Sequence, residues 1–255
     1  MAPRLEQGKP VGQVIAMGGG GFSMDGPNTL LDDFILSLSP RQPAKVCFVP
    51  TASADSATYL VNFYRAFSGR AIPSDLTIFD PAVVPRRPKS SSDLASYIAE
   101  QDIIYVGGGN TANLLAIWRA HGVDRVLHDA WIEGKILCGI SAGMICWFRD
   151  GLTDSFGRLA PLGDGLGLID GSACPHYSAD KGRPHAYRKA IRQGMLPGYA
   201  ADDGAALHFL GSDLVEVVSS REGAAAYRLE IVDGRVEETR LRTRYLGDGS
   251  VSADA

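Results

Sequence analysis

Short apolar runs alternate with helix-like segments through the first 150 residues of the chain. Continuous apolar runs, which are typical of strands buried on both faces, are expected at 11–17, 44–52, 76–80, 102–106 and 136–138. Helices are expected between them, at 28–39, 58–67, 92–99, 111–120 and 124–131. This alternation predicts an α/β fold, with a mostly parallel sheet covered by helices on both faces.

The pattern changes after residue 165. The segments LVEVVSS, AAAYRLEIVDG and RVEETRLR indicate hairpin strands, and Asp233-Gly234 has the composition of a tight hairpin turn. We therefore expect an antiparallel extension at the C-terminal end of one domain. That domain takes in residues 1–255, with a core of about 12–246.

Composition and charge narrow the range of partners. The net charge of −4 gives no reason to expect a nucleic acid or an anionic membrane surface as partner. The four cysteines stand singly, which favours buried reduced thiols over a disulfide or a zinc site. The first twelve residues lack the apolar stretch of a secretory signal, and no run approaches the length of a membrane span. We expect a cytoplasmic protein that uses neither a metal ion nor a cofactor.

A G-x-S-x-G pentapeptide, GISAG at 139–143, lies between a strand-like and a helix-like apolar run. A sharp strand-to-helix turn of this kind lifts a serine hydroxyl clear of a sheet and exposes it for nucleophilic attack. Ser141 is therefore the predicted nucleophile. The N–H of Ala142 is the predicted first donor to the oxyanion that forms during acyl transfer.

A second glycine cluster follows another predicted strand, in VGGGNTANLL at 106–115. Loops at the carboxyl ends of parallel strands meet at one edge of the sheet, so this loop and Ser141 are expected to face the same crevice. Gly109 is the predicted second oxyanion donor, and Asn110 is placed with the substrate. The run Gly18–Gly21 does not fit a dinucleotide-binding motif, and a tight turn is as good a reading of it as a site loop.

A serine nucleophile needs a base, and five histidines are available. His176 directly follows a proline at the end of an apolar run, where a short rigid loop would suit a general base. His208 lies within an alternating strand, where a structural role is more common. His176 is therefore preferred, with His208 as its rival.

Taken in order, GGGNT at 107–111, GISAG at 139–143 and PHY at 175–177 resemble the dipeptidase E/cyanophycinase family of serine peptidases. The resemblance covers roughly residues 12 to 210. It implies a glutaminase-like α/β fold and hydrolysis of dipeptides or short peptides from the N-terminal side, in the best-known branch after an N-terminal aspartate. Carried over by motif, Ser141 is the nucleophile, His176 the base, and Gly109 and Ala142 the oxyanion donors.

The same resemblance places the triad's acid a short stretch after the serine. Asp154, thirteen residues after Ser141, is the residue expected there. The Asp202-Asp203 pair at another strand end is the alternative, and Asp203 is otherwise expected near the substrate amine. For the carboxylate of an aspartyl substrate, the resemblance points to Arg183 shortly after the histidine, with Arg188 as the alternative.

Other functions stay open on the sequence alone. A broader aminopeptidase or a cyanophycinase-like peptidase fits the same motifs. An esterase on a different elbow fold and a glutaminase-like module without catalysis fit less well, since the chain has no H-G-G-G segment and carries serine rather than cysteine at the elbow. The expected partner is a small peptide substrate, and self-association is left open.

Overall fold

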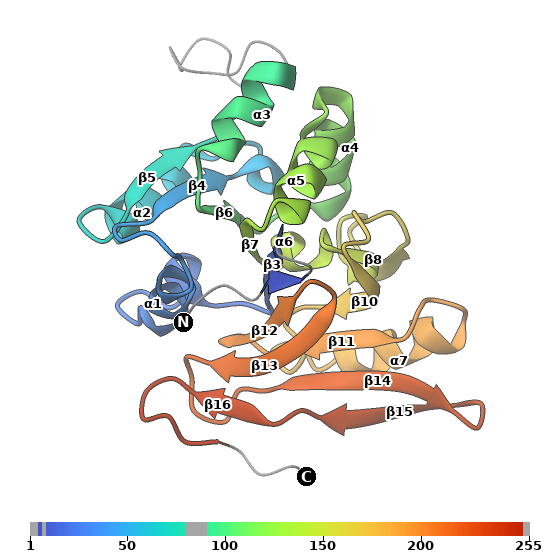
Figure 1. The fold of residues 1–255 in the computed structure, drawn as a ribbon. Coiled ribbons are helices and arrows are strands. Elements are labelled where there is room, and N and C mark those ends of the chain that lie inside the picture. Colours follow the sequence, from blue (N-terminus) through green and yellow to red (C-terminus); the bar gives the residue numbers. More distant parts are fainter. Residues whose placement is uncertain (1–4, 7–8, 80–90, 252–255) are drawn as a thin grey trace.

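In the computed structural model, residues 5–6, 9–79 and 91–251 are described. The strands of the larger sheet are β3 (Gln13–Met17), β4 (Lys45–Val49), β5 (Ile72–Asp75), β6 (Ile103–Val106), β7 (Ile136–Ile140), β12 (Ala205–Leu210), β13 (Asp213–Ser219) and β16 (Thr243–Tyr245). They lie in the order β16-β13-β12-β3-β7-β6-β4-β5 (Figure 1). Strands β3 to β7 are mutually parallel, and β12 joins them antiparallel to β3.

A second sheet packs beside the first. Its strands are β8 (Phe148–Thr153), β9 (Ala160–Leu162), β10 (Ile169–Cys174), β11 (Gly198–Ala201), β14 (Ala226–Val232) and β15 (Arg235–Arg240). Strand β10 is parallel to β8 and β11, whereas β9, β14 and β15 each pair antiparallel to a neighbour. A short pair, β1 (Leu5–Glu6) and β2 (Lys9–Pro10), precedes both sheets.

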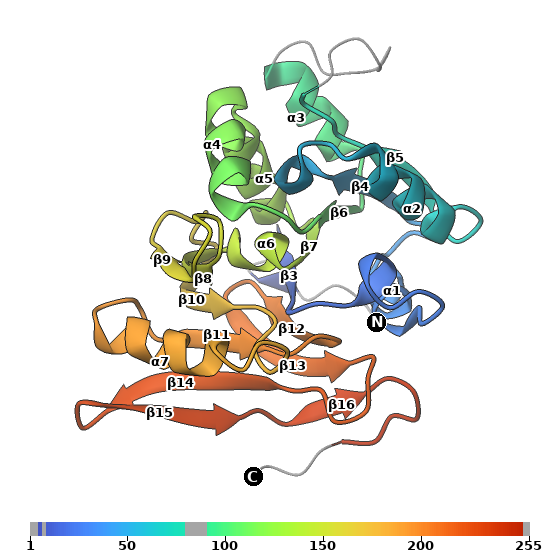
Figure 2. The same ribbon diagram turned by 180° about the vertical axis from the view of Figure 1, so that it is seen from behind.

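Helices cover both faces of the larger sheet, as Figures 1 and 2 show. The helices are α1 (Leu30–Ser37), α2 (Ala57–Phe67), α3 (Ser91–Ala99), α4 (Thr111–His121), α5 (Val123–Ile132), α6 (Ala142–Ile145) and α7 (Arg183–Arg192), with single turns η1 (Gly21–Ser23) and η2 (Thr51–Ser53). Helices α1 and α2 pack on one face, α3 to α5 pack on the other, and α7 lies on the second sheet.

Strand β4 explains why the parallel strands are apolar throughout. Side chains alternate between the two faces of a strand, and both faces here are covered. Cys47 and Val49 join the core under α3 to α5, whereas Val46 and Phe48 join the core under α1 and α2. The predicted α/β fold with helices on both faces is therefore confirmed.

Two local predictions differ from the structure. The strand expected at 76–80 lies instead at β5, an edge strand whose backbone pairing with β4 requires no apolar run. Residue 80 itself lies outside the described residues. Helix α6 ends at Ile145, because the chain turns there and Phe148 begins β8. The expected C-terminal extension is the β14–β15 hairpin, which adds to the second sheet through β11 and turns at Asp233-Gly234 as predicted.

The four cysteines are free and buried, as expected. No helix in the described part of the chain combines the length and the apolar character needed to span a membrane.

The carboxyl group of Asp32 is buried within the core. The Asp32 side chain on α1 is only 1% exposed, and the Tyr105 hydroxyl donates to its Oδ1 at 3.4 Å. Loss of hydration penalises the charged form, so burial raises the pKa of Asp32 to about 7. The folded protein therefore holds a proton at a pH where the unfolded chain has released it.

We expect this group to reduce stability as the pH rises from about 4 to about 7, since the folded pKa is raised above the unfolded value. Asp32→Asn removes the charge and keeps an oxygen that can accept from Tyr105. Its free energy of unfolding should exceed the wild-type value by more at pH 8 than at pH 5, with a difference on the order of a few kcal/mol, which appears as a larger rise in melting temperature at pH 8. Thermal melts at both pH values measure this. An equal offset at the two values would contradict it.

Candidate functional site

Ser141 occupies the turn between β7 and α6 in a conformation that is rare for a residue with a side chain. Its φ and ψ are 58° and −107°. The flanking glycines make the turn possible: a Cβ on Gly139 would lie 2.2 Å from the Gly143 carbonyl oxygen, and one on Gly143 would lie 2.4 Å from the Val106 carbonyl oxygen. Such strained positions are maintained where the surrounding packing fixes them, and they concentrate at functional sites.

His176 reaches Ser141 from the second sheet. It follows β10, has a φ of 54°, and its Nε2 lies 2.8 Å from the Ser141 Oγ. Its backbone N–H donates to the Gly18 carbonyl oxygen at 3.2 Å, which ties the histidine loop to the end of β3. The two residues that the motifs singled out as nucleophile and base are therefore in hydrogen-bond contact.

The carboxylate on the other side of His176 is Asp203, in the loop between β11 and β12. Its Oδ1 lies 2.5 Å from the His176 Nδ1. That hydrogen bond is the main reason why the pKa of Asp203 lies below its usual range. A neighbouring carboxylate holds an imidazole in one tautomer and one orientation, and it stabilises the protonated ring.

Asp154 does not occupy this position, and the expectation that it lies beside His176 is wrong. It follows β8, its side chain is 63% exposed, and its Oδ2 accepts a hydrogen bond from the Arg183 guanidinium at 3.0 Å. Residue spacing from Ser141 could not reveal this, because the carboxylate that meets His176 comes from a loop much later in the chain. Asp202, the other member of the alternative pair, is buried and accepts from the Ser178 and Ala225 N–H groups.

The first glycine run packs directly against this histidine–carboxylate pair. A Cβ on Gly19 would lie 2.0 Å from the Asp203 Oδ1 and 3.1 Å from the His176 Nδ1. The Gly204 N–H donates to the Gly19 carbonyl oxygen at 2.9 Å, so the two loops run side by side. Only glycine leaves room for the carboxylate here. Gly18–Gly21 is therefore better described as a loop of the site than as a turn alone. The run of four consecutive glycines is the sequence feature that could have indicated this role.

The Gly107–Asn110 loop packs against Ser141. A Cβ on Gly108 would be 3.4 Å from the Ser141 Cβ. Among the described residues, the N–H groups of Gly109 and Ala142 have no hydrogen-bond partner in the protein. Gly109 has a φ of 139°, and a Cβ there would lie 2.2 Å from the Ala52 carbonyl oxygen. The loop therefore needs glycine at this position. It leaves the Gly109 N–H unbonded next to Gly108, the glycine that packs against Ser141.

Two residues expected at the substrate are already engaged within the protein. The Asn110 Oδ1 caps α4 by accepting from the Asn113 N–H at 2.9 Å, and its Nδ2 donates to the Ser155 carbonyl oxygen at 3.0 Å. Arg183 is 7% exposed; besides its bond to Asp154, it lies 3.8 Å from an Asp180 oxygen. Its alternative, Arg188, pairs with Glu238 at 2.6 Å.

The rival base, His208, is not near Ser141. Its Nε2 lies 2.9 Å from the Gln13 Oε1, and its Nδ1 lies 3.5 Å from a Glu216 oxygen. The close contact with His208 is the largest cause of the lowered pKa of Glu216. His208 therefore has a structural role within the sheet. No group of three or more metal-ligating side chains occurs in the described part of the chain.

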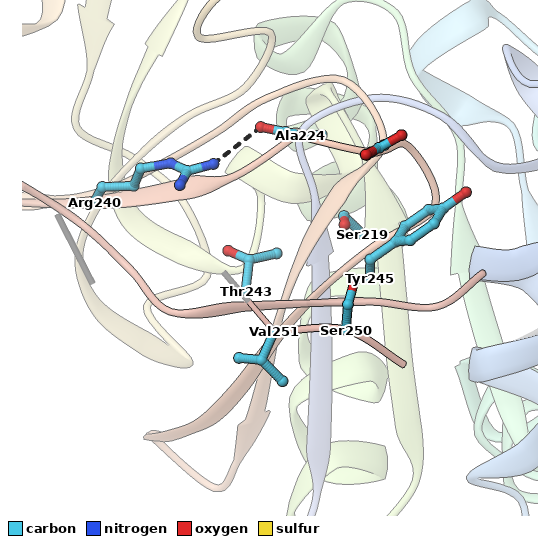
Figure 3. A pocket seen from close by; sticks show the side chains of 9 residues that line it. Ser219, Ala224, Arg240, Thr243, Tyr245, Ser250 and Val251 are labelled. Atoms are coloured by element: carbon cyan, nitrogen blue, oxygen red, sulfur yellow. Dashed lines mark hydrogen bonds between the residues drawn. The ribbon is translucent and has the colours of Figure 1, made fainter. Parts of the chain in front are cut away.

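A separate hollow lies at the C-terminal edge of the molecule (Figure 3). Its lining includes Ser219, Arg240, Thr243, Tyr245 and Ser250. The Arg240 guanidinium donates to the Gly223 carbonyl oxygen across it at 3.1 Å. Ser141, His176 and Asp203 do not line this hollow, so it is distinct from the site described above.

Comparison with known proteins gives one family. The model of peptidase family S51 matches residues 14–217 of the chain. A peptidase of Bacillus subtilis, the uncharacterized peptidase YgaJ, is 50% identical over 237 residues, which cover 92% of this chain and 99% of that protein. The uncharacterized peptidase Lmo0363 of Listeria monocytogenes is 29% identical over 168 residues, covering 64% of this chain and 77% of that one.

Solved structures share the fold. A putative peptidase E protein from Listeria monocytogenes superposes with a TM-score of 0.59 at 20% identity, covering 80% of this chain and 97% of that chain. A peptidase from an acI-B1 actinobacterium superposes with a TM-score of 0.62 at 16% identity, covering 89% and 93% of the two chains. At these identities the likeness supports the fold.

Proposed function

Since the chain belongs to peptidase family S51 and is a serine-type peptidase, we propose that it is an exopeptidase that removes N-terminal residues from dipeptides or short peptides. The observation that carries the chemistry is the continuous contact from Ser141 through His176 to Asp203, with separations of 2.8 Å and 2.5 Å. The similarity to a putative peptidase E protein of known structure supports a peptidase of this kind, and the choice of short peptides follows from the family resemblance of the three sequence motifs.

In the proposed reaction His176 acts first as base and then as acid. Its Nε2 takes the proton of the Ser141 hydroxyl while the Oγ attacks the carbonyl carbon of the scissile peptide bond. The protonated ring then donates to the leaving amine, which breaks the C–N bond and leaves an acyl-enzyme. Water, activated by the same imidazole, releases the acyl group. Asp203 stays ionised throughout and stabilises the imidazolium.

The N–H groups of Gly109 and Ala142 hold the negative oxygen that forms when Ser141 attacks. Both are unbonded within the described protein; Ala142 directly follows the serine, and Gly109 directly follows Gly108, which packs against it. Donors fixed before the reaction stabilise the transition state without having to reorganise, which makes this one of the larger catalytic terms.

The surroundings of Arg183 favour peptides with varied N-terminal residues over a strict preference for an N-terminal aspartate. Its guanidinium already faces Asp154 and Asp180, so a substrate carboxylate would become the third negative group around one cation. For Arg183 to give a strong preference for aspartate, the Asp154 side chain would have to move away from the guanidinium. We therefore propose hydrolysis of peptides with varied N-terminal residues, with aspartate among them but not favoured.

The choice of triad acid is tested by two matched substitutions. Asp203→Asn should lower kcat by about 10³- to 10⁴-fold, because the amide cannot stabilise the imidazolium and favours the wrong tautomer. Asp154→Asn should lower it by less than about tenfold, since this side chain does not contact His176. Steady-state kinetics on one dipeptide measure both. A large loss in the Asp154 variant with little in the Asp203 variant would reverse the assignment.

Substrate preference is tested by the ratio of kcat/KM for an Asp-X dipeptide to that for the matching Leu-X dipeptide. In the wild type this ratio should lie within about tenfold of unity. Asp154→Asn should raise it, because the guanidinium would lose a competing negative charge. Arg188→Gln serves as the control variant, since Arg188 pairs elsewhere, with Glu238. A wild-type ratio far above ten would restore the aspartate preference.

A further inference from the structure

The Gly107–Asn110 loop presents a physical difficulty for an oxyanion donor. Three consecutive glycines have no side chains to restrict their backbone angles, so the direction of each N–H must be fixed from outside the loop. A donor that is displaced by about 1 Å loses much of its catalytic effect.

Three of the four N–H groups in the loop have protein acceptors. The Gly107 N–H donates to the Val49 carbonyl oxygen at 3.1 Å, and the Asn110 N–H donates to the Ala52 carbonyl oxygen at 2.8 Å. Both of these acceptors are backbone groups: Val49 is the last residue of β4, and Ala52 lies in the single turn η2 that follows it. The Gly108 N–H donates instead to a side chain, the Tyr59 hydroxyl, at 3.2 Å. The Gly109 N–H is left as the unbonded donor.

Tyr59 is itself firmly held. It lies on α2, and its ring contacts those of Phe22 and Phe48 with centroid separations of 5.5 Å and 4.9 Å. The Ser23 side chain, in η1, also interacts with this hydroxyl and favours its ionised form, although burial has the larger effect and raises the pKa of Tyr59. The hydroxyl therefore lies where three segments meet: α2, η1 and the glycine loop.

We propose that Tyr59 is a positioning residue for the oxyanion hole. By holding the Gly108 N–H, it fixes the Gly107–Gly108 peptide, while the Ala52 carbonyl oxygen fixes the Gly109–Asn110 peptide by accepting from the Asn110 N–H. The remaining peptide, between Gly108 and Gly109, then presents its N–H toward the oxygen that develops when Ser141 attacks. This inference rests on the proposed function.

Tyr59→Phe removes the hydroxyl and keeps the ring packing. We expect kcat to fall about tenfold with KM changed less than about twofold, because the displaced donor acts mainly in the transition state. Tyr64→Phe is the matched control. It lies on the same helix, but its hydroxyl pairs with the Asp75 Oδ1 at 2.5 Å, away from the glycine loop. The control should retain wild-type kcat.

A second measurement separates positioning from a general loss of structure. With the aminoaldehyde leucinal, the Ser141 oxygen adds to the aldehyde carbon, the serine proton passes to His176, and the aldehyde oxygen becomes an oxyanion. The alcohol leucinol binds without forming one. The inhibition constant of leucinal should rise about tenfold in Tyr59→Phe, as kcat falls, while that of leucinol stays the same. Ser23→Ala should also raise the inhibition constant of leucinal, by a smaller factor.

The proposal would be overturned if the inhibition constant of leucinal were unchanged in both Tyr59→Phe and Ser23→Ala. It would also be overturned if leucinal and leucinol lost affinity by the same factor. If Tyr59→Phe melts too early to assay, Ser23→Ala decides by the same ratio of the two inhibitors. Failure of the proposed function is distinguishable, because the wild type would then hydrolyse no peptide of the panel and leucinal would inhibit no better than leucinol.

Discussion

The hydrogen bond from the His176 N–H to the Gly18 carbonyl oxygen joins the two sheets at the point on which the site depends. Ser141 belongs to the larger sheet and His176 to the second one, so their contact exists only while the sheets are held in register. Glycine makes the approach possible: a Cβ on Gly18 would lie 2.3 Å from the Ala201 carbonyl oxygen. The Tyr177 N–H, which donates to that same oxygen, extends the link toward the Asp203 loop.

The site also depends on strain that the rest of the fold must support. Ser141 and His176 both have positive φ values, which cost roughly 1–3 kcal/mol each for residues with side chains. The cores on either face of the larger sheet provide the rigid support, since β3 and β7 are buried almost completely. Both reactive side chains are therefore held in place before a substrate arrives, and no large rearrangement is needed to bring them together.

The sequence was sufficient to predict the residues whose roles depend on local patterns. Ser141 stands in a strand–turn–helix pentapeptide, and His176 follows a proline at a strand end. The buried parallel strands were also recognisable, because both faces of each strand are covered. Strand β5 was misplaced, since an edge strand needs only backbone pairing and its IPSD segment has no apolar signal.

What the sequence could not reveal were contacts made between distant segments. Asp203 meets His176 because β11 lies beside β10 in the second sheet, and no spacing along the chain encodes that neighbour. Arg183 could be found as a nearby cation, but not its two carboxylate partners. The contact of Gly19 with Asp203 was hidden for the same reason, although the four consecutive glycines marked the segment as unusual.

The central claim, that Ser141 is activated by His176 at this junction of the two sheets, is tested most directly by covalent labelling. Incubation with a fluorophosphonate followed by peptide mapping in the mass spectrometer identifies which hydroxyl reacts. We predict a single adduct on Ser141, with a labelling rate that falls as the pH is lowered, because a protonated imidazole cannot accept the serine proton. An adduct on another serine, or no adduct from an enzyme that still hydrolyses peptides, would contradict it.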